Sequence, residues 1–246
     1  MLIDPERCIC CGECVALCPM NAIRLRSKDA ASGRDAHAAI DRDECVECGV
    51  CFRSGVCPEA AIQEESLPWP RILRKAFSDP VFTHPGTDIP GRGTEEMKTN
   101  DVTGRFRAGM IGIGLEFGRP GVGTRLREAE AAIRRLLPLG VALEPNNPLT
   151  QLIADPATGA LKPEVREEKV LSAIVEAIVP EEAFERVLAE VRAIAAAADT
   201  VISLGVIGKV AADGRVPAAE AMRRAGISPS LNGKVNVGLG RPAYRF

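Results

Sequence analysis

Hydrophobic and polar positions follow two different periods in the second half of the chain, and together they predict a series of strands and helices. Residues 108–117 form a nearly continuous apolar run with interspersed glycines, which is typical of a buried strand. Residues 123–139 and 181–198 carry apolar side chains at every third or fourth position, so each is predicted to form a helix with one buried face. Further strands are predicted at residues 150–155, 168–179, 200–210 and 233–242.

The first six of these elements follow the order strand, helix, strand, strand, helix, strand, and the strand at residues 233–242 comes after them. This order is typical of the split β-α-β arrangement, in which an antiparallel sheet carries both helices on one face. We therefore expect an α+β sandwich over residues 105–246. Residues 170–179 also fit a helical pattern, and this alternative to a strand stays open.

Residues 65–104 interrupt the regular pattern, because five prolines and many polar residues fall within this segment. Prolines at this spacing exclude a long helix or a central strand, so we expect an extended linker with at most a brief helix over residues 71–77. The segment also carries bulky apolar residues. We therefore expect it to lie along both domains or along a partner, not as a free tether.

Cysteine spacing, and not periodicity, characterises the N-terminal region. All nine cysteines of the chain lie between Cys8 and Cys57. They form two copies of one pattern: C-x2-C-x2-C-x3-C-P begins at Cys8, and C-x2-C-x2-C-x5-C-P begins at Cys45. Three closely spaced thiolates on a tight loop suit three irons of one cubane cluster, and a fourth cysteine from elsewhere completes the set.

On these motifs, residues 1–64 resemble a bacterial ferredoxin with two [4Fe-4S] clusters. In that family the fourth cysteine of each run binds the neighbouring cluster, and this crossover implies the ligands of both clusters. The first cluster is expected on Cys8, Cys11, Cys14 and Cys57, and the second on Cys45, Cys48, Cys51 and Cys18.

Zinc binding and disulfide bonds are two alternative uses of the cysteines. Paired C-x2-C elements also occur in zinc sites, but a zinc ribbon gives no reason for a triple run followed by Cys-Pro, twice. An odd number of cysteines suits metal binding in a reducing compartment better than a disulfide framework. Zinc or a chance cluster therefore remains the alternative to an iron-sulfur site.

Two positions depart from the ferredoxin pattern. Cys10 lies between ligand positions, so we expect a spare thiol that points away from the iron. The connection between Cys51 and Cys57 is two residues longer than its counterpart in the first motif, and it contains Arg53. An arginine close to a cluster sulfur would favour the reduced cluster, whereas an exposed loop arginine is the simpler interpretation.

The predicted architecture is therefore α+β. A two-cluster ferredoxin domain over residues 1–64 is followed by an extended Pro-rich linker over residues 65–104 and a split β-α-β, or ferredoxin-like, sandwich domain over residues 105–246. The net charge of −2 gives no reason to expect nucleic acid or acidic lipid as a partner. Without a membrane-length apolar run or room for a signal peptide before Cys8, we expect a cytoplasmic protein with no membrane partner.

A Gly-Arg-Pro sequence follows two of the predicted strands, at Arg119 and Arg241. If these strands are neighbours, both arginines converge near a helix capped by Thr124, and the helix N-terminus would favour an anion such as a carboxylate or phosphate. The alternative is a pair of Gly-rich turns with solvated arginines, because the sequence matches no phosphate loop or dinucleotide fingerprint.

Residues 86–246, which include "GRGTEEMKTNDVTGRF", are similar to the corresponding part of iron-sulfur proteins of the 6-hydroxynicotinate reductase family. This resemblance implies the reduction of a heteroaromatic ring at low potential. A small carboxylate ligand is then expected between the linker and the C-terminal domain.

Three functions follow from these observations. The first is an electron-transfer protein or subunit that delivers single low-potential electrons to a redox partner protein, with the C-terminal domain for docking or ligand binding. The second is a reductase of a heteroaromatic carboxylate. The third is a non-redox binding module with structural clusters. A sheet edge in the C-terminal domain could also serve a homo-oligomer.

Overall fold

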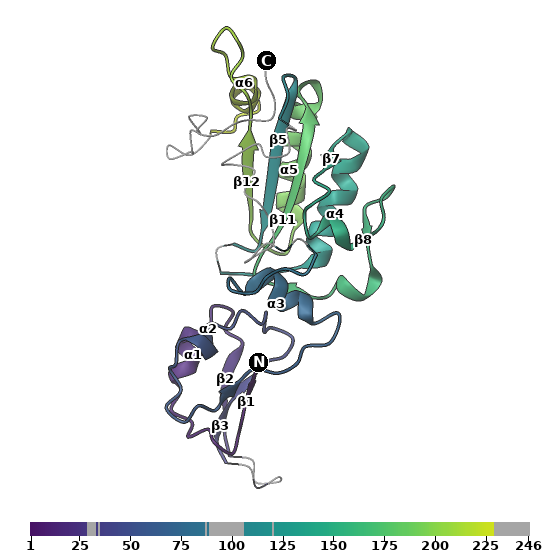
Figure 1. Ribbon diagram of the computed structural model, residues 1–246. Helices are drawn as coiled ribbons and strands as arrows, with labels where there is room; N and C mark the ends of the chain where they lie inside the picture. Colours follow the sequence, from purple (N-terminus) through teal and green to yellow (C-terminus); the bar gives the residue numbers. More distant parts are fainter. Residues whose placement is uncertain (29–32, 34, 87, 89–105, 120, 229–246) are drawn as a thin grey trace.

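The computed structural model places two units end to end, with a short helix, α3 (Ile72–Ser78), between them (Figure 1). The N-terminal unit holds β1 to β4, and the C-terminal unit holds β5 to β12. None of the described helices is long and apolar enough to cross a membrane. The structure describes residues 1–28, 33, 35–86, 88, 106–119 and 121–228.

The N-terminal unit consists of two antiparallel strand pairs and two short helices. The strand pairs are β1 (Leu2–Ile3) with β4 (Ile62–Gln63) and β2 (Ile23–Arg26) with β3 (His37–Ile40), and the helices are α1 (Glu13–Leu17) and α2 (Val50–Arg53).

The two cysteine motifs of this unit fold into loops with the same backbone pattern. Cys10 and Glu47 hold equivalent positions, and both adopt a left-handed conformation, with φ of 58° and 57°. Gly12 and Gly49 follow two residues later with φ of 82° and 69°, and each is the N-cap of the helix that follows. Glycine suits such a position because it lacks the Cβ that makes positive φ costly. The unit is therefore an internal repeat in structure as well as in sequence.

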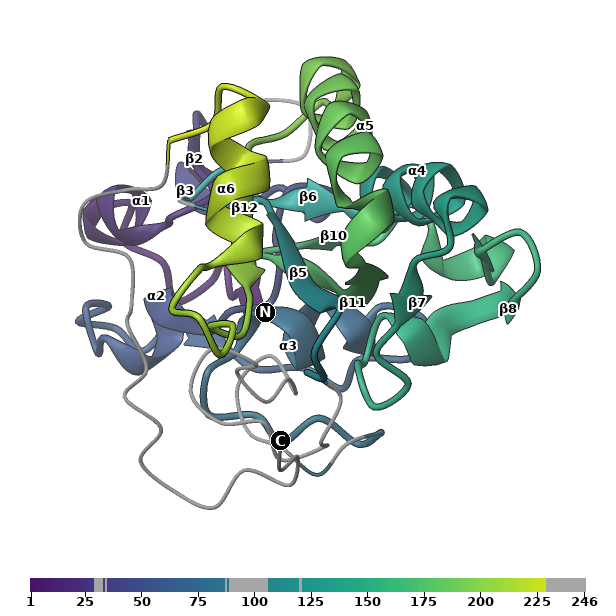
Figure 2. The same ribbon diagram turned by 90° about the horizontal axis from the view of Figure 1, so that it is seen from above.

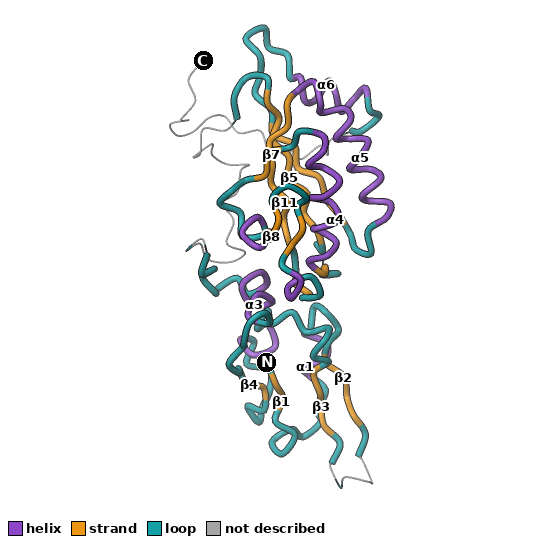
Figure 3. Tube along the Cα trace, turned by 90° about the vertical axis from the view of Figure 1, so that its right-hand side faces the viewer, coloured by secondary structure: helices purple, strands orange, loops and turns teal. Residues whose placement is uncertain are grey.

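The C-terminal unit is built on a four-stranded sheet in the order β12-β5-β11-β7, and every neighbouring pair is antiparallel. Its strands are β5 (Met110–Phe117), β7 (Ala142–Leu143), β11 (Ala173–Pro180) and β12 (Ile202–Ile207). Three helices, α4 (Leu126–Leu136), α5 (Phe184–Ala197) and α6 (Pro217–Arg224), lie on one face of the sheet (Figures 2 and 3).

The main core lies between this sheet and its helices. Ile113, Leu115 and Phe117 of β5 are fully buried, as are Leu126 and Leu136 of α4. They share the core with β11 and α5, whose apolar positions also face inward. Burial of apolar surface at this scale is the dominant favourable contribution to folding.

Smaller elements surround the sheet. The paired strands are β6 (Thr124–Arg125) with β10 (Lys169–Val170) and β8 (Ile153–Asp155) with β9 (Ala160–Leu161), and the 3-10 helices are η1 (Leu137–Leu139), η2 (Thr150–Leu152), η3 (Pro163–Val165) and η4 (Glu181–Ala183).

Mixed helices and strands confirm the predicted α+β class. The prediction that residues 150–155 supply a strand of the main sheet is wrong, because β8 pairs with β9 in a separate hairpin. The sheet instead takes β7, which pairs through only two residues and left no recognisable period in the sequence. The strand predicted at residues 233–242 lies outside the described residues.

The segment predicted as an extended linker contains helix α3, at the place where the sequence predicts a brief helix over residues 71–77. Pro70 precedes the helix, and Asp79 and Pro80 end it, so the stretch between the prolines is long enough for two turns. Leu73 and Phe77 are 4% and 2% exposed and belong to the main core of the C-terminal unit. The helix is therefore a packed element of the fold.

His84 lies in the interior of the structure. Its side chain is 4% exposed, and its ring packs edge-on against Phe77 with 5.5 Å between ring centroids. Nδ1 accepts a hydrogen bond from the Gly86 N–H at 3.1 Å, whereas Nε2 is buried without a hydrogen-bond partner in the described structure. Burial lowers the pKa of His84, so the neutral ring is favoured.

Candidate metal centres

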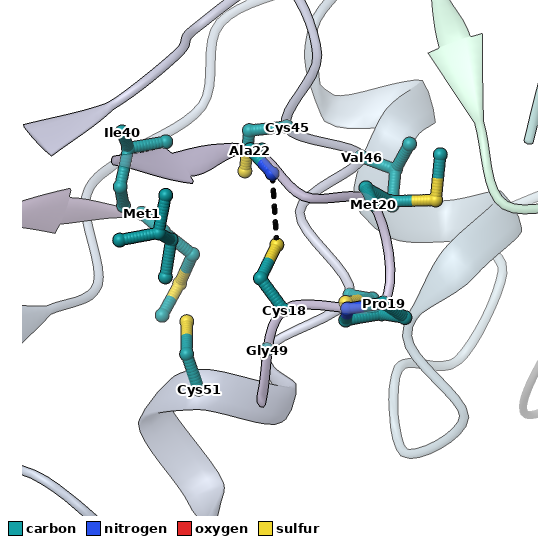
Figure 4. Close-up of a pocket in the computed structure, with 12 residues that line it drawn as sticks. Met1, Cys18, Pro19, Met20, Ala22, Ile40, Cys45, Val46, Gly49 and Cys51 are labelled. Atoms are coloured by element: carbon teal, nitrogen blue, oxygen red, sulfur yellow. Dashed lines mark hydrogen bonds between the residues drawn. The ribbon is translucent and has the colours of Figure 1, made fainter. Parts of the chain in front are cut away.

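Eight of the nine cysteines line two separate cavities in the N-terminal unit. Each cavity takes three cysteines from one motif and one from the other, in the groups that the motif spacing predicts. The first cavity is lined by Cys8, Cys11, Cys14 and Cys57, and the second, shown in Figure 4, by Cys18, Cys45, Cys48 and Cys51.

Backbone N–H groups point at several of the sulfurs. The N–H of Ala22 donates to Cys18 Sγ at 3.2 Å (Figure 4), and the N–H of Ala61 donates to Cys57 Sγ at the same distance. These two bonds join equivalent positions of the two motifs. Hydrogen bonds of this kind stabilise negative charge on sulfur and influence the reduction potential of a bound cluster.

Apolar side chains fill the space around both cavities. Ile23 lines the second cavity and Ile62 lines the first, and they are 3% and 5% exposed. Met1 and Ile40 complete the apolar wall of the second cavity (Figure 4). The thiols are therefore held in a poorly hydrated environment.

Burial raises the pKa of several of these thiols. The pKa of Cys51 rises to about 11, first because of burial and then because of the nearby sulfurs of Cys45, Cys48 and Cys18. The pKa values of Cys14, Cys45 and Cys48 also rise, with burial as the main cause. Four thiolates are unfavourable here unless a bound cation compensates their charge, and a coordinating thiol is held deprotonated by its metal.

The donor set fits an iron-sulfur cluster better than a single ion. Zinc bonded to four sulfurs at about 2.3 Å would require them to converge on one point. Within the described chain, no three His, Cys, Asp or Glu side chains lie close enough together to share one metal ion. Four thiols around an apolar cavity, with N–H donors toward the sulfur, are the groups that hold a multi-iron cluster.

Two arginines donate hydrogen bonds to backbone carbonyls of the second motif. Arg53 Nη2 donates to the Cys48 carbonyl at 2.6 Å, and Arg74 Nη1 of α3 donates to the Cys45 carbonyl at 3.0 Å. Arg53 also pairs with Asp79 at 2.8 Å between Nη1 and Oδ1. Arg53 is exposed, as the simpler interpretation expects, but it is the last residue of α2 and its side chain makes both of these contacts.

Glu47 is a buried carboxylate within the second motif. It is 1% exposed, and its Oε1 accepts a hydrogen bond from Arg71 Nε at 3.0 Å, while its Oε2 pairs with the Met1 ammonium group. The equivalent position in the first motif is Cys10, which lines neither cavity. This outcome agrees with the expectation that Cys10 is not a ligand.

The second cavity lies beside the contact between the two units. Met20 and Val46, next to its cysteines, pack against Leu171 of the C-terminal unit. Gly123 permits a close approach at this contact, because a Cβ there would lie 2.5 Å from Met20 Cε. No residue that lines the first cavity comes from beyond Ile62 in the chain.

Polar contacts reinforce this junction. Arg125 Nη2 pairs with Asp43 Oδ2 at 2.6 Å, and the Leu171 N–H donates to Ser78 Oγ of α3 at 2.8 Å. Lys169 also pairs with Glu44 across the same contact. The second motif is therefore tied to α3 and to the C-terminal unit.

Of the anion site expected at Arg119, Thr124 and Arg241, only Arg119 and Thr124 lie within the described residues. Arg119 is exposed and pairs with Glu116 at 2.8 Å, and Arg241 lies outside the described residues. Thr124 is not a helix cap, because α4 has Arg125 as its N-cap with no side-chain capping bond. Thr124 is instead buried in β6, where its hydroxyl donates to the Arg125 carbonyl at 3.1 Å. The Gly-rich loop serves the contact with Met20.

Sequence reasoning missed the roles of Glu47 and Arg74. When the two motifs are aligned position by position, Glu47 corresponds to Cys10. A charged residue therefore occupies a position whose backbone is left-handed. No comparable signal marks Arg74, because its role depends on where α3 packs.

Residues 7–61 match a family model described as a 4Fe-4S dicluster domain. No curated protein matches the chain. No solved structure matches it either. The match and the two cysteine-lined cavities identify this part of the chain as an iron-sulfur, ferredoxin-like segment with a role in electron transfer.

Proposed function

We propose that the chain is an electron carrier, or the electron-transfer subunit of an oxidoreductase, with two [4Fe-4S] clusters. The observation that carries this proposal is the distribution of the cysteines over two cavities, each supplied by both motifs. The ligands are Cys8, Cys11, Cys14 and Cys57 for the first cluster and Cys45, Cys48, Cys51 and Cys18 for the second.

Bound clusters of this type each accept and release one electron. The protein contributes the thiolates, the N–H donors of Ala22 and Ala61, and an apolar shell that limits water. Low hydration suits electron transfer because little solvent has to reorganise when the charge changes.

A redox partner has easier access to the first cluster. Ile9 lines its cavity and is 62% exposed, and Cys11 is also exposed. In contrast, the loop of the second cluster is covered by α3 and by the C-terminal unit. Ile9→Gln is therefore expected to slow electron exchange with a protein acceptor several-fold, while the potentials of both clusters stay nearly unchanged because no charge is added.

We interpret the C-terminal unit as a split β-α-β sandwich, because its sheet order and its element order fit that arrangement. Helix α3 contributes to the core of this unit, so the domain extends beyond the predicted boundary at residue 105. The boundary of the ferredoxin domain at residue 64 stays a prediction.

A small ligand of this unit would find basic groups at the end remote from the clusters. A cavity there is lined by Arg107, Lys209 and Arg215, with Met110 and Ile111 as apolar neighbours. Figure 1 shows α6, which begins beside this cavity, at the end of the molecule opposite the N-terminal unit. A carboxylate in this cavity would be bound far from the clusters, so no observation favours the alternative of a reductase that reduces such a ligand.

Reductive titration of the anaerobically purified protein tests the proposed function. We expect uptake of about two electrons per chain in one-electron steps, and reoxidation by a one-electron protein acceptor such as cytochrome c. Clusters that resist reduction at every physiological potential would overturn it in favour of a structural role. Reoxidation by 6-hydroxynicotinate alone would overturn it in favour of a reductase.

A further inference from the structure

Arg53 is a charged residue at a position that carries no charge in the first motif. It is the last residue of α2, and its guanidinium group folds back over the start of that helix. Its Nη1 lies so close to Gly49 that any side chain at Gly49 would displace it. Gly49 lines the second cavity, so the positive charge of Arg53 lies directly over the loop that closes this cavity. The equivalent residue of α1 is Ala16.

Asp79 holds the guanidinium in place. Asp79 is the C-cap of α3 and is 2% exposed, and its carboxylate accepts from Arg53 at 2.8 Å. Lys75 lies within 4.0 Å of the same carboxylate. A charged contact that is partly buried is screened less by solvent than a surface ion pair.

Other charges around the second loop largely neutralise one another. Glu47 is paired with Arg71 and the Met1 ammonium group, and Arg74 is paired with Glu168. The guanidinium groups of Arg53 and Arg74 donate directly to carbonyls of ligand cysteines, whereas their acidic partners Asp79 and Glu168 lie at the end of α3 and just before β10. Among the described residues that line the second cavity, none has an acidic or basic side chain, whereas Glu13 lines the first.

Burial of the second cluster disfavours its reduction, because the added electron increases negative charge in a poorly hydrated place. A fixed positive charge on the loop opposes this effect. We propose that Arg53 raises the reduction potential of the second cluster and thereby keeps the buried cluster reducible by the exposed first one. This inference rests on the proposed function.

The redox step involves one electron only. The electron passes from an external reductant to the first cluster and then to the second, and neither a bond nor a proton has to move. Arg53 supplies a fixed positive charge and keeps its proton throughout.

The test uses spectroelectrochemical titration of proteins that hold one cluster each. Cys57→Ser protein keeps only the second cluster, and Cys18→Ser protein keeps only the first. We expect Arg53→Gln to lower the midpoint potential in the Cys57→Ser background and to leave it unchanged in the Cys18→Ser background. Arg53→Lys retains the charge and is expected to restore part of the loss. Arg24→Gln, at an exposed arginine of β2, is the matched control and should shift neither potential.

Several results separate this inference from the proposed function. Equal shifts in both backgrounds, or no shift in either, would overturn the role of Arg53 and leave the electron carrier intact. Clusters that cannot be reduced in any variant would overturn the proposed function itself. If a cysteine variant does not fold, the same substitutions are made in protein with both clusters, where only one of the two titration steps should move.

Discussion

The two halves of the N-terminal unit share a backbone but differ in their surroundings. Ile9 and Val46 hold equivalent positions in the two motifs, yet Ile9 is 62% exposed and Val46 only 1%. Cys10 likewise corresponds to Glu47, which is buried and paired with Arg71. Local sequence therefore determines how each loop folds, whereas the rest of the chain determines what each loop can contact.

The difference arises from the segment that follows the unit. Helix α3 supplies Arg71 and Arg74 to the second loop, and Leu171 of the C-terminal unit covers its cysteines. Among the residues that the structure describes, no such cover lies over the first cavity, and the lining comes from the N-terminal unit. We therefore propose that a redox partner reaches the first cluster directly and the second cluster only through the first.

A charge placed at the equivalent positions Ile9 and Val46 should have the largest unequal effect. Val46→Glu leaves an uncompensated buried carboxylate, which is expected to cost about 3 to 5 kcal/mol. Ile9→Glu introduces the same charge at an exposed position and should change stability by less than about 0.5 kcal/mol. Thermal unfolding of the two cluster-loaded variants measures both, and equal losses would show that the two halves are not buried differently.

Loss of Arg74 should weaken the packing of the second cysteine loop against α3 and the C-terminal unit. The side chain is 6% exposed, and Arg74→Ala removes a pair with Glu168 and hydrogen bonds to three backbone carbonyls. We expect a loss of about 3 kcal/mol, because the ion pair with Glu168 is broken and the carbonyls of Asp43 and Cys45 lose their Arg74 donor. Arg24→Ala, at an exposed position, is the control and should be nearly neutral. Chemical denaturation of both variants distinguishes them, and a neutral Arg74→Ala would contradict the account of the junction.

Low pH should weaken the packing of α3 over the second half of the N-terminal unit, through protonation of His84. Burial lowers the pKa of His84 in the folded state, so the unfolded chain binds the proton more readily. Its contribution to stability is full above the unfolded pKa of about 6.5 and falls as pH drops below that value, by at most about 1.4 kcal/mol per pH unit. His84→Gln should therefore make the thermal midpoint less dependent on pH between 8 and 5.5. An unchanged pH dependence would exclude His84 as the cause.

Cys10 should give the smallest effect, since it lines neither cavity. Cys10→Ser is expected to keep all of the iron and sulfide and to change stability by less than about 0.5 kcal/mol. Colorimetric analysis measures the iron and sulfide contents, and Cys14→Ser, which should lose a cluster, serves as the comparison. A Cys10→Ser protein that lost a cluster would make Cys10 a ligand and would break the equivalence between Cys10 and Glu47.

Sequence alone predicted the features that depend on local spacing. The two cysteine runs predicted which thiols are gathered together, and the period of residues 123–139 predicted α4, because each pattern is contained in one stretch of chain. Strand β7 was missed because two paired residues are too few to create a period. Thr124 was misassigned because a threonine before a helix resembles a cap, whereas the pairing of β6 with β10 moves the cap to Arg125.

The features that sequence did not predict depend on contacts between distant segments. Arg53 and Asp79 are separated by a strand and most of a helix, and no pattern links them. The burial of His84 follows from the packing of Phe77, which in turn follows from the contact of α3 with the sheet. Such long-range contacts decide how the two cysteine-lined cavities differ, although each motif alone predicts a cluster.

An anaerobic count of iron and acid-labile sulfide in the full chain tests the central claim most directly. The account predicts about eight irons and about eight sulfides per chain, falling to about half in Cys57→Ser and in Cys18→Ser protein. About four irons or fewer in intact, cluster-protected protein would contradict the assignment of eight cysteines to two clusters.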